Sequence, residues 1–436
     1  MPRTNDADVL IIGAGAAGLA ASLALVQAGL RVIVIEARDR VGGRVWTVHD
    51  SGSGAPIELG AEFVHGRPQE IFDLVEGAEL PIHEVSGERW CSRGGKLGLC
   101  PNLYEQFESV FKRMKSDGPD RSFQKFLDSE ATDLPEDIRR LTLEYIEGFE
   151  AAKPDEIGVQ SLVRENKKSE EIDADRAFRL AAGYDGLLRT LTLGLESNYP
   201  KILLKTVVRA VHWHRGSVEV ATEERTFCAP RVLVTLPLAV LQAGIVTFEP
   251  ALAGKQEPLS RLAMGAVVRV VLRFNERFWE EIGVDGRSLA NMSFLHSDDP
   301  HFPTWWTTMP RVTPILTGWS GGPHALQLTA KSDEEIVDCA VSSLAKLLKT
   351  DAKQVRQSVA ASYFHNWQTD PFSRGAYSYA KVGGVEAARE LAQSVDGTLF
   401  FAGEATNFEG RQGTVDGAIA SGQRAAKEIL ESIKKQ

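Results

Sequence analysis

The stretch V-L-I-I-G-A-G-A-A-G-L-A-A-S at residues 9–22, followed by V-I-V-I-E-A-R-D-R-V-G-G-R at residues 32–44, decides the fold of this chain. An apolar run of strand length leads into G-x-G-x-x-G, then into a helix pattern rich in small residues, then into a second β-branched run. Gly13 permits a tight turn, Gly15 lets the backbone approach a pyrophosphate, and Gly18 lets the helix lie close to the strand. The sequence therefore predicts a βαβ unit whose helix N-terminus binds the phosphates of a nucleotide.

Two charged residues extend this motif. Glu36 ends the second strand, where a carboxylate can accept hydrogen bonds from ribose hydroxyls. Arg44 follows a second glycine turn, Gly42-Gly43, and its forked side chain can pair with a pyrophosphate in a bidentate manner. A surface salt bridge is the alternative interpretation of Arg44. At this point NAD, NADP and FAD all remain possible as the bound nucleotide.

The composition is that of an ordinary globular protein. The chain has 436 residues, is 43% hydrophobic and 25% charged, and carries a net charge of −10. This length allows two domains with sizeable cores. The negative charge argues against nucleic acid as a partner and is compatible with cationic ligands. Apolar runs stay below membrane-spanning length, so we expect a cytoplasmic protein without membrane attachment.

The cysteines show no metal-ligand spacing, and His212 and His214, which share one face of a strand and could suggest a metal, have no evident carboxylate or cysteine partner. The four cysteines, Cys91, Cys100, Cys228 and Cys339, form no C-x-x-C pair. We interpret them as buried free thiols of a protein in a reducing compartment, and we expect no metal site.

The remaining pattern indicates a discontinuous organisation. Helical spacing runs from about residue 102 to residue 196, beginning with Y-E-Q-F-E-S-V-F-K-R-M at residues 104–114, and residues 201–222 alternate as in a β-hairpin. We predict an α/β protein in which residues 1–85, 197–275 and 390–436 build a Rossmann-type nucleotide domain. Residues 86–196 and 276–389 would build a second, α+β substrate-binding domain.

Three further motifs resemble one family. Gly42-Gly43-Arg44 is followed by Leu59-Gly60-Ala61, and the C-terminal part reads L-F-F-A-G-E-A-T-N-F-E-G-R-Q-G-T-V-D-G-A-I-A-S-G-Q-R-A-A at residues 399–426. Together with V-L-V-T-L-P-L at residues 232–238 and V-V-R-V-V-L-R-F at residues 267–274, these resemble the flavin-dependent amine oxidases. That family includes monoamine oxidases, polyamine and spermine oxidases, and the flavin domain of histone-lysine demethylases. The resemblance spans the whole chain and narrows the cofactor to FAD.

The resemblance implies a set of cofactor-binding residues. They are Gly13, Gly15, Ala16, Ala17, Gly18, Glu36, Ala37, Arg38, Gly43, Arg44, Leu59, Gly60, Ala61, Glu62, Val208, Trp367, Gly403, Glu404, Gly413, Thr414 and Val415. Family likeness places Glu404 near the ribityl chain and the backbone of Val208 against the adenine. The helix that begins at Gly413 would direct its positive end at the pyrimidine edge of the flavin. Ala376 stands where covalently flavinylated members have cysteine, so we expect non-covalent FAD.

The substrate side is also implied by the resemblance. Tyr377 takes the position of one wall of the family's aromatic slot, where a ring guides an amine by packing and cation–π contacts. Thr414 replaces the second tyrosine of monoamine oxidases, which leaves the slot open on one side. His65 resembles a histidine that lines the substrate channel in polyamine-type members, although a lone loop histidine is more often simply solvated.

Arg269 is the sharpest departure from the family pattern. It stands where most members have the lysine that holds a water against the flavin, and we count it with Tyr377 as a candidate catalytic residue. Arginine could hold the same water, could favour a substrate with a carboxylate, or could simply pack on its strand. Trp305, Trp306 and Trp319 are expected in the core rather than in the cavity.

We therefore predict an FAD-dependent oxidase of primary or secondary amines. The family mechanism implies hydride transfer from the amine α-carbon to flavin N5, an imine product, and reoxidation by O₂ with release of H₂O₂. The partners would be a small-molecule amine and O₂, with a monomer or a homodimer as the assembly. An L-amino-acid oxidase on the same fold is the main alternative, because Arg269 or another arginine could hold a carboxylate. A flavin-bound scaffold with little turnover is the alternative outside enzymes.

The other rivals fit less well. Phytoene desaturases and protoporphyrinogen oxidases share the N-terminal turn, but the segment around Tyr377 argues against both. An NAD(P)-dependent reductase is disfavoured because the chain has one G-x-G-x-x-G and no second dinucleotide unit.

Overall fold

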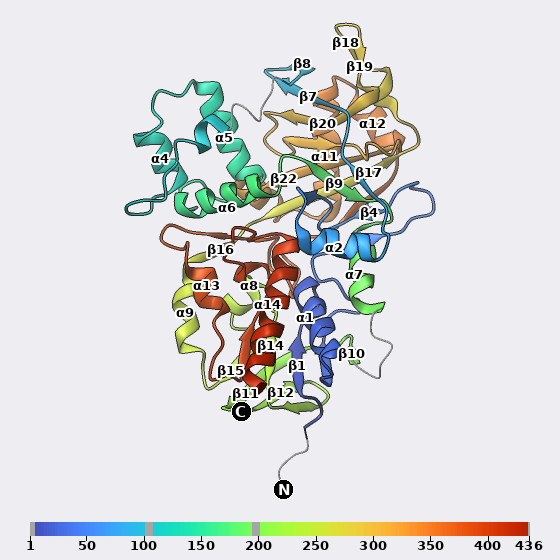
Figure 1. Ribbon diagram of the computed structural model, residues 1–436. Coiled ribbons are helices and arrows are strands. Elements are labelled where there is room, and N and C mark those ends of the chain that lie inside the picture. The colour runs from blue at the N-terminus through green and yellow to red at the C-terminus, as the bar shows by residue number, and fades with distance from the viewer. Residues whose placement is uncertain (1–4, 101–107, 194–200, 435–436) are drawn as a thin grey trace.

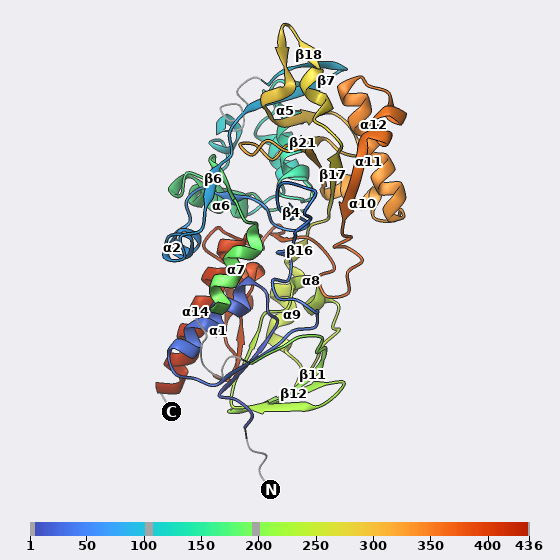
Figure 2. The same cartoon turned by 90° about the vertical axis from the view of Figure 1, so that its right-hand side faces the viewer.

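The chain folds into two bodies joined by several crossings of the backbone. The computed structural model describes residues 5–100, 108–193 and 201–434. In Figure 1 the lower body holds β1, the first strand, together with α14, the last helix, and the upper body holds a large twisted sheet. The view in Figure 2, turned by 90°, shows the same two bodies one above the other.

A five-stranded parallel sheet forms the centre of the lower body. Its order is β10 (Lys201–Leu203), β2 (Val32–Ile35), β1 (Val9–Ile12), β14 (Val232–Val234) and β25 (Leu399–Phe401). Every neighbouring pair is parallel. β1 and β2 are continuous apolar runs that are buried along their whole length, as expected of strands covered on both faces.

Helices cover one face of this sheet. Alternate side chains of β1 pack on α1 (Ala16–Gln27) and α14 (Val415–Lys434). The two helices lie unusually close, since a Cβ on Gly422 would come within 2.2 Å of the Ala17 carbonyl oxygen. This contact explains the small residues in both helix patterns.

A second sheet covers the other face through the remaining side chains of β1 and β2. Its order is β13 (Thr226–Ala229), β12 (Ser217–Thr222), β11 (Val208–His214) and β15 (Thr247–Glu249). β11 and β12 form the predicted hairpin. Residues 201–203 do not belong to it, because β10 instead pairs in parallel with the edge strand β2.

A seven-stranded sheet dominates the upper body. Its order is β23 (Val359–Phe364), β17 (Val267–Phe274), β22 (Ile315–Gly321), β21 (Thr304–Trp306), β20 (Met292–Ser297), β7 (Glu88–Arg93) and β8 (Lys96–Leu99). The helix α11 (Asp333–Leu348) packs on it in one core with β17. β17 pairs with β22 and β23 and so belongs to the upper body. The predicted nucleotide-binding segment, which extended to residue 275, had included this strand.

Three helices stand beside this sheet and form a core of their own: α4 (Phe123–Ser129), α5 (Glu136–Gly148) and α6 (Val159–Glu171). Of the helix predicted over residues 104–114, residues 108–111 are helical and residues 104–107 lie outside the described part of the chain. The predicted helical region is interrupted by β9 (Ala177–Leu180), which pairs with β5 (Val64–His65) and β6 (Ile82–Glu84).

Shorter elements complete the two bodies. They are α2 (Gln69–Gly77), α7 (Tyr184–Leu193), α8 (Leu238–Gln242), α9 (Ala253–Ser260), α10 (Gly322–Leu328), α12 (Ala352–Ser358), α13 (Ala387–Ala392), β3 (Thr47–Val48), β4 (Ile57–Glu58), β16 (Leu262–Met264), β18 (Gly283–Val284), β19 (Arg287–Ser288), β24 (Ser378–Ala380), and the 3₁₀ turns η1 (Phe278–Glu281), η2 (Leu289–Asn291) and η3 (Glu404–Thr406). None of the helices in the described part of the chain has the length and apolar character that crossing a bilayer requires.

The expectation of four free thiols is wrong for one pair. Cys91 on β7 and Cys100, just after β8, are joined by a disulfide, while Cys228 and Cys339 are free. The pairing depends on the β7–β8 hairpin, in which Cys91 lies opposite Gly98 and the Cys100 N–H donates to the Arg89 carbonyl at 2.9 Å. The spacing of the cysteines gave no sign of this hairpin.

Candidate functional site

One cavity of about 1000 Å³ runs from the parallel sheet into the upper body. It is lined by the first glycine turn, the end of β2, the second glycine turn and the loop before α14, and by β17, α5 and α6 above them. All the predicted cofactor and substrate residues line it except Gly18, and the two predicted catalytic residues, Arg269 and Tyr377, line it as well.

The glycine turn has the geometry that its sequence predicts. Gly13 has a φ of +106°, and a Cβ on Gly18 would lie 2.0 Å from the Gly13 carbonyl oxygen. Gly15 precedes α1, and no side chain caps this helix start. A Cβ on Gly15 would meet no protein atom within 4 Å. The backbone therefore opens onto the cavity at the point where an anion gains most from the helix dipole.

The carboxylate of Glu36 organises the end of β2. Its two oxygens accept hydrogen bonds from the backbone N–H groups of Ala14, at 2.7 Å, and Arg38, at 2.8 Å. Arg38 in turn forms a bidentate pair with Asp370, at 2.6 and 2.8 Å. Asp370 also accepts from His365, and these hydrogen bonds hold the pKa of the Asp370 carboxyl far below its ordinary value although burial opposes this. Sequence reasoning did not find Asp370.

Arg44 connects the beginning of the chain to its end. It donates to the Ala376 carbonyl at 2.7 Å and to Glu404 at 2.8 Å. Glu404 also accepts from the Gly413 N–H at 3.0 Å and from the Ser378 hydroxyl at 2.5 Å. Arg44 thus forms a salt bridge, but in the wall of the cavity rather than on the outer surface, with 24% of its side chain and 6% of that of Glu404 exposed.

Thr414 serves the helix that follows it. Its hydroxyl accepts from the Gly417 N–H at 3.0 Å and donates to the Arg411 carbonyl at 2.9 Å. The side chain thus caps the first turn of α14 as well as lining the cavity. Trp367, on the loop after β23, donates to the Leu59 carbonyl at 2.7 Å. This hydrogen bond fixes the loop after β23 to Leu59 in the wall of the cavity.

Aromatic rings surround the upper part of the cavity. The Tyr377 hydroxyl donates to the Phe149 carbonyl at 2.6 Å, and its ring packs beside Gly413. The Phe149 ring stacks on Tyr145 with centroids 5.0 Å apart and meets His65 edge-on at 5.3 Å. Burial and the nearby Arg411 lower the pKa of His65 to about 4, so this imidazole is neutral at pH 7.

Arg269 is engaged by a carboxylate. Its guanidinium donates to the Gly60 carbonyl at 2.8 Å and pairs with Glu62. Glu62 also accepts from Arg179 at 2.7 Å and from the Trp306 indole at 3.0 Å. Burial alone would raise the pKa of Glu62, but Arg269 and Arg179 together lower it.

The three tryptophans divide between core and cavity. Trp305 is fully buried in the core of the upper body, as predicted. Trp306 and Trp319 line the cavity instead, with centroids 5.8 Å apart. Trp306 faces it because alternate residues of a strand point to opposite sides of the sheet. Trp319 faces it from the neighbouring strand β22.

Two glutamates that the sequence did not reveal also line the cavity. Glu150 follows α5 and Glu165 lies on α6, and both are partly accessible. Burial raises the pKa of Glu150 to about 7. Burial and the neighbouring Glu150 raise the pKa of Glu165 well above its ordinary value. The upper part of the cavity, which we call the aromatic chamber, is therefore bordered by Glu150, next to Phe149, and by Glu165, whose pKa Glu150 influences.

This geometry agrees with the comparison to known families. The model of the flavin-containing amine oxidoreductases matches residues 16–185 and 121–430. The chain belongs to this family. The predictions of a flavin-dependent amine-oxidising enzyme and of its two-domain α/β fold are confirmed.

Similar proteins include two kinds of curated relative. The chain is 28% identical to rice polyamine oxidase 3 over 99% of its own length and 92% of that protein. It is also 28% identical to human lysine-specific histone demethylase 2, over 98% of its own length but 53% of that protein. The chain thus spans about half of the demethylase and most of the polyamine oxidase.

Solved structures show the same fold. Wild-type putrescine oxidase bound to putrescine superposes with a TM-score of 0.82 at 23% identity, covering 98% of this chain and 99% of that one. Cyclohexylamine oxidase from Brevibacterium oxydans IH-35A gives a TM-score of 0.81 at 23% identity, with 98% and 100% covered.

Proposed function

We propose that this protein is an FAD-dependent oxidase of primary or secondary amines and that it prefers amines carrying a second cationic nitrogen. The observation that carries the proposal is one continuous cavity. It joins a nucleotide-binding turn, at Gly15 and Glu36, to an aromatic chamber that contains Glu150 and Glu165. A flavin bound there would supply the hydride acceptor and the site at which O₂ is reduced to H₂O₂.

The lower cavity fits FAD. The open backbone at Gly15 suits a pyrophosphate, Glu36 suits the ribose, and the start of α14 would place its positive end near the flavin ring. Ala376 offers no nucleophile for a covalent bond to the ring. We therefore expect acid precipitation of the protein to release all of the yellow cofactor into the supernatant. Colour that stays with the pellet would show a covalent link.

The upper chamber suits an amine rather than an amino acid. Tyr377, Phe149 and the Trp306–Trp319 pair offer flat, apolar surfaces that orient a carbon chain and exclude water. His65 is neutral at pH 7 and does not repel a cation. Arg269, the arginine that the sequence singled out for a substrate carboxylate, is already paired with Glu62.

A substrate panel tests the proposal. We expect putrescine or spermine to bleach the flavin absorbance under anaerobic conditions, with benzylamine and cyclic amines reacting more weakly and L-amino acids not at all. Admission of O₂ should restore the colour and release H₂O₂. Bleaching by L-amino acids alone would favour the amino-acid oxidase, and no bleaching by any compound would favour a binding protein.

The two glutamates are expected to recognise the distal nitrogen. Putrescine and n-butylamine differ only in that nitrogen, so the ratio of their KM values isolates its contribution. Glu165→Gln and Glu150→Gln should each raise the KM for putrescine about 10-fold relative to n-butylamine, since hydrogen bonds to charged groups are worth about 1.5–3 kcal/mol. Glu171→Gln, an exposed residue on the same helix, is the matched control and should leave the ratio unchanged.

This preference should depend on pH. Burial raises the pKa of Glu150 to about 7, so the pair gains negative charge as the pH rises through 7. The ratio of the KM for putrescine to that for n-butylamine should therefore fall between pH 6 and pH 8. In the Glu150→Gln/Glu165→Gln double variant the ratio should stay flat. An equal slope in wild type and double variant would assign the distal nitrogen to other residues.

A further inference from the structure

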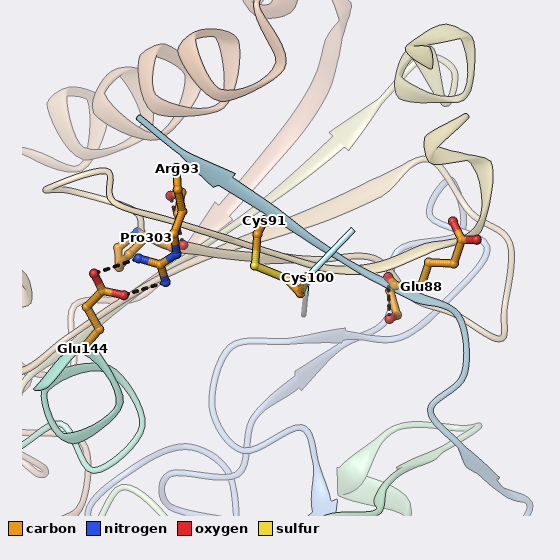
Figure 3. The surroundings of a disulfide bond; sticks show 8 residues. Glu88, Cys91, Arg93, Cys100, Glu144 and Pro303 are labelled. Carbon is orange, nitrogen blue, oxygen red and sulfur yellow. Dashed lines mark hydrogen bonds and ion pairs between the residues drawn. A yellow bond between two sulfur atoms is a disulfide. The ribbon is translucent and has the colours of Figure 1, made fainter. Parts of the chain in front are cut away.

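The disulfide lies at the outer end of the chamber wall rather than in a remote surface loop. Cys91 and Cys100 share a small apolar cluster with Leu141 and Ile138 of α5. Figure 3 shows the bond beside the pair formed by Arg93 and Glu144, which meet at 3.1 and 2.8 Å. The β7–β8 hairpin is therefore fixed to α5 by an apolar contact at the sulfurs and by an ion pair one turn further along the helix.

α5 carries this connection into the chamber. The helix ends at Gly148, whose carbonyl accepts from the Trp319 indole at 2.8 Å. The next residue, Phe149, accepts from the Tyr377 hydroxyl and stacks on Tyr145. Glu150 follows directly. A displacement of α5 would consequently move the aromatic wall and one of the two carboxyl groups, while the contacts of the glycine turn and of Glu36 involve other segments.

We propose that the Cys91–Cys100 bond is a redox modification site whose reduction loosens α5 and weakens the binding of the amine. A dithiol supplies two electrons and two protons, the S–S bond breaks, two thiols form, and the dithiol closes to its own disulfide. Thiol sulfurs cannot remain at bonding distance, so they must separate in a space bounded by Leu141 and Ile138. Cys100 is partly exposed and gives the reductant access.

The kinetic part of this proposal rests on the proposed amine oxidation, so the test includes a readout that needs no substrate. The holoenzyme is treated anaerobically with dithiothreitol and desalted. Titration of thiols in denaturant should rise from two to four per chain, because the sequence holds four cysteines and two of them are paired. Hydrogen exchange of residues 136–148 should accelerate, the KM for the amine should rise about 3- to 10-fold, and the flavin content should stay constant.

Two variants make the test specific. Cys91→Ser/Cys100→Ser should behave like the reduced wild type and should not respond to dithiothreitol. Cys228→Ser/Cys339→Ser, which lacks the two free cysteines, should respond like the wild type. If the first variant does not fold, reduction and reoxidation of the wild-type protein still provide the comparison.

The outcomes separate the two proposals. Four titratable thiols in the protein as purified, or unchanged exchange of α5 after reduction, would overturn the redox site. Faster exchange with an unchanged KM would overturn its effect on the substrate. If no amine is oxidised, the proposed function fails, while thiol titration and exchange still decide whether the bond controls α5.

Discussion

Gly15→Val is expected to give a folded protein that purifies without flavin. Gly15 has a φ of −74°, which any residue can adopt, and a Cβ there meets no protein atom within 4 Å. The added methyl groups would instead fill the part of the cavity where a pyrophosphate must approach the start of α1. We expect the affinity of the apoprotein for FAD to fall at least ~100-fold, or about 2.7 kcal/mol.

Two further substitutions serve as comparisons for this prediction. Gly77→Val, at the end of α2, also adds side-chain atoms in open space but lies outside the cavity, so this variant should stay folded and yellow. Gly18→Val would place its Cβ 2.0 Å from a backbone oxygen, so we expect this variant not to fold. Flavin titration with circular dichroism distinguishes the three cases. Wild-type affinity in Gly15→Val would place the pyrophosphate elsewhere.

The lower body was predictable because its signals are local. Within residues 9–44, strand, turn, helix and strand follow one another, and each glycine of G-x-G-x-x-G has a steric reason that can be stated from the sequence. Burial on both faces explains the continuous apolar runs of β1 and β2. The C-terminal helix and the carboxylate Glu404 were found through the family resemblance, and the structure pairs Glu404 with Arg44 and with the Gly413 N–H just before that helix.

The partners of the charged residues were not predictable, because they lie far apart in the chain. Arg179 reaches Glu62 across 117 positions, and Arg38 reaches Asp370 across 332. The first contact depends on the pairing of β5 with β9, and the second on where the loop after β23 meets the end of β2. No periodicity in a single segment reports such a contact.

Short elements escaped prediction for a related reason. β10 has three residues, and their alternation continues into β11, so the pattern alone cannot show that the chain changes sheets between them. The disulfide likewise depends on the register of the two-stranded hairpin that brings Cys91 and Cys100 together.

Arg269→Met is expected to destabilise the protein by about 3–5 kcal/mol, the range found when one partner of a buried ion pair is removed. The Arg269 side chain is 5% exposed and the Glu62 side chain 10% exposed, so the remaining carboxylate would lose a buried counter-charge. Arg179 and the Trp306 indole still hold Glu62, which favours the lower end of the range. Urea unfolding of the variant and the wild type measures the difference.

A triple-mutant comparison separates this pairing from a direct role in oxidation. In Arg269→Met/Arg179→Met/Glu62→Gln no unpaired charge of this cluster is left, so most of the lost stability should return. If Arg269 acts only through Glu62, this triple variant should also recover the wild-type rates of flavin reduction and reoxidation in stopped-flow experiments. If reoxidation stays slow although stability returns, the guanidinium itself assists the reaction with O₂. Unchanged half-reactions and unchanged stability in the single variant would show that the ion pair contributes to neither.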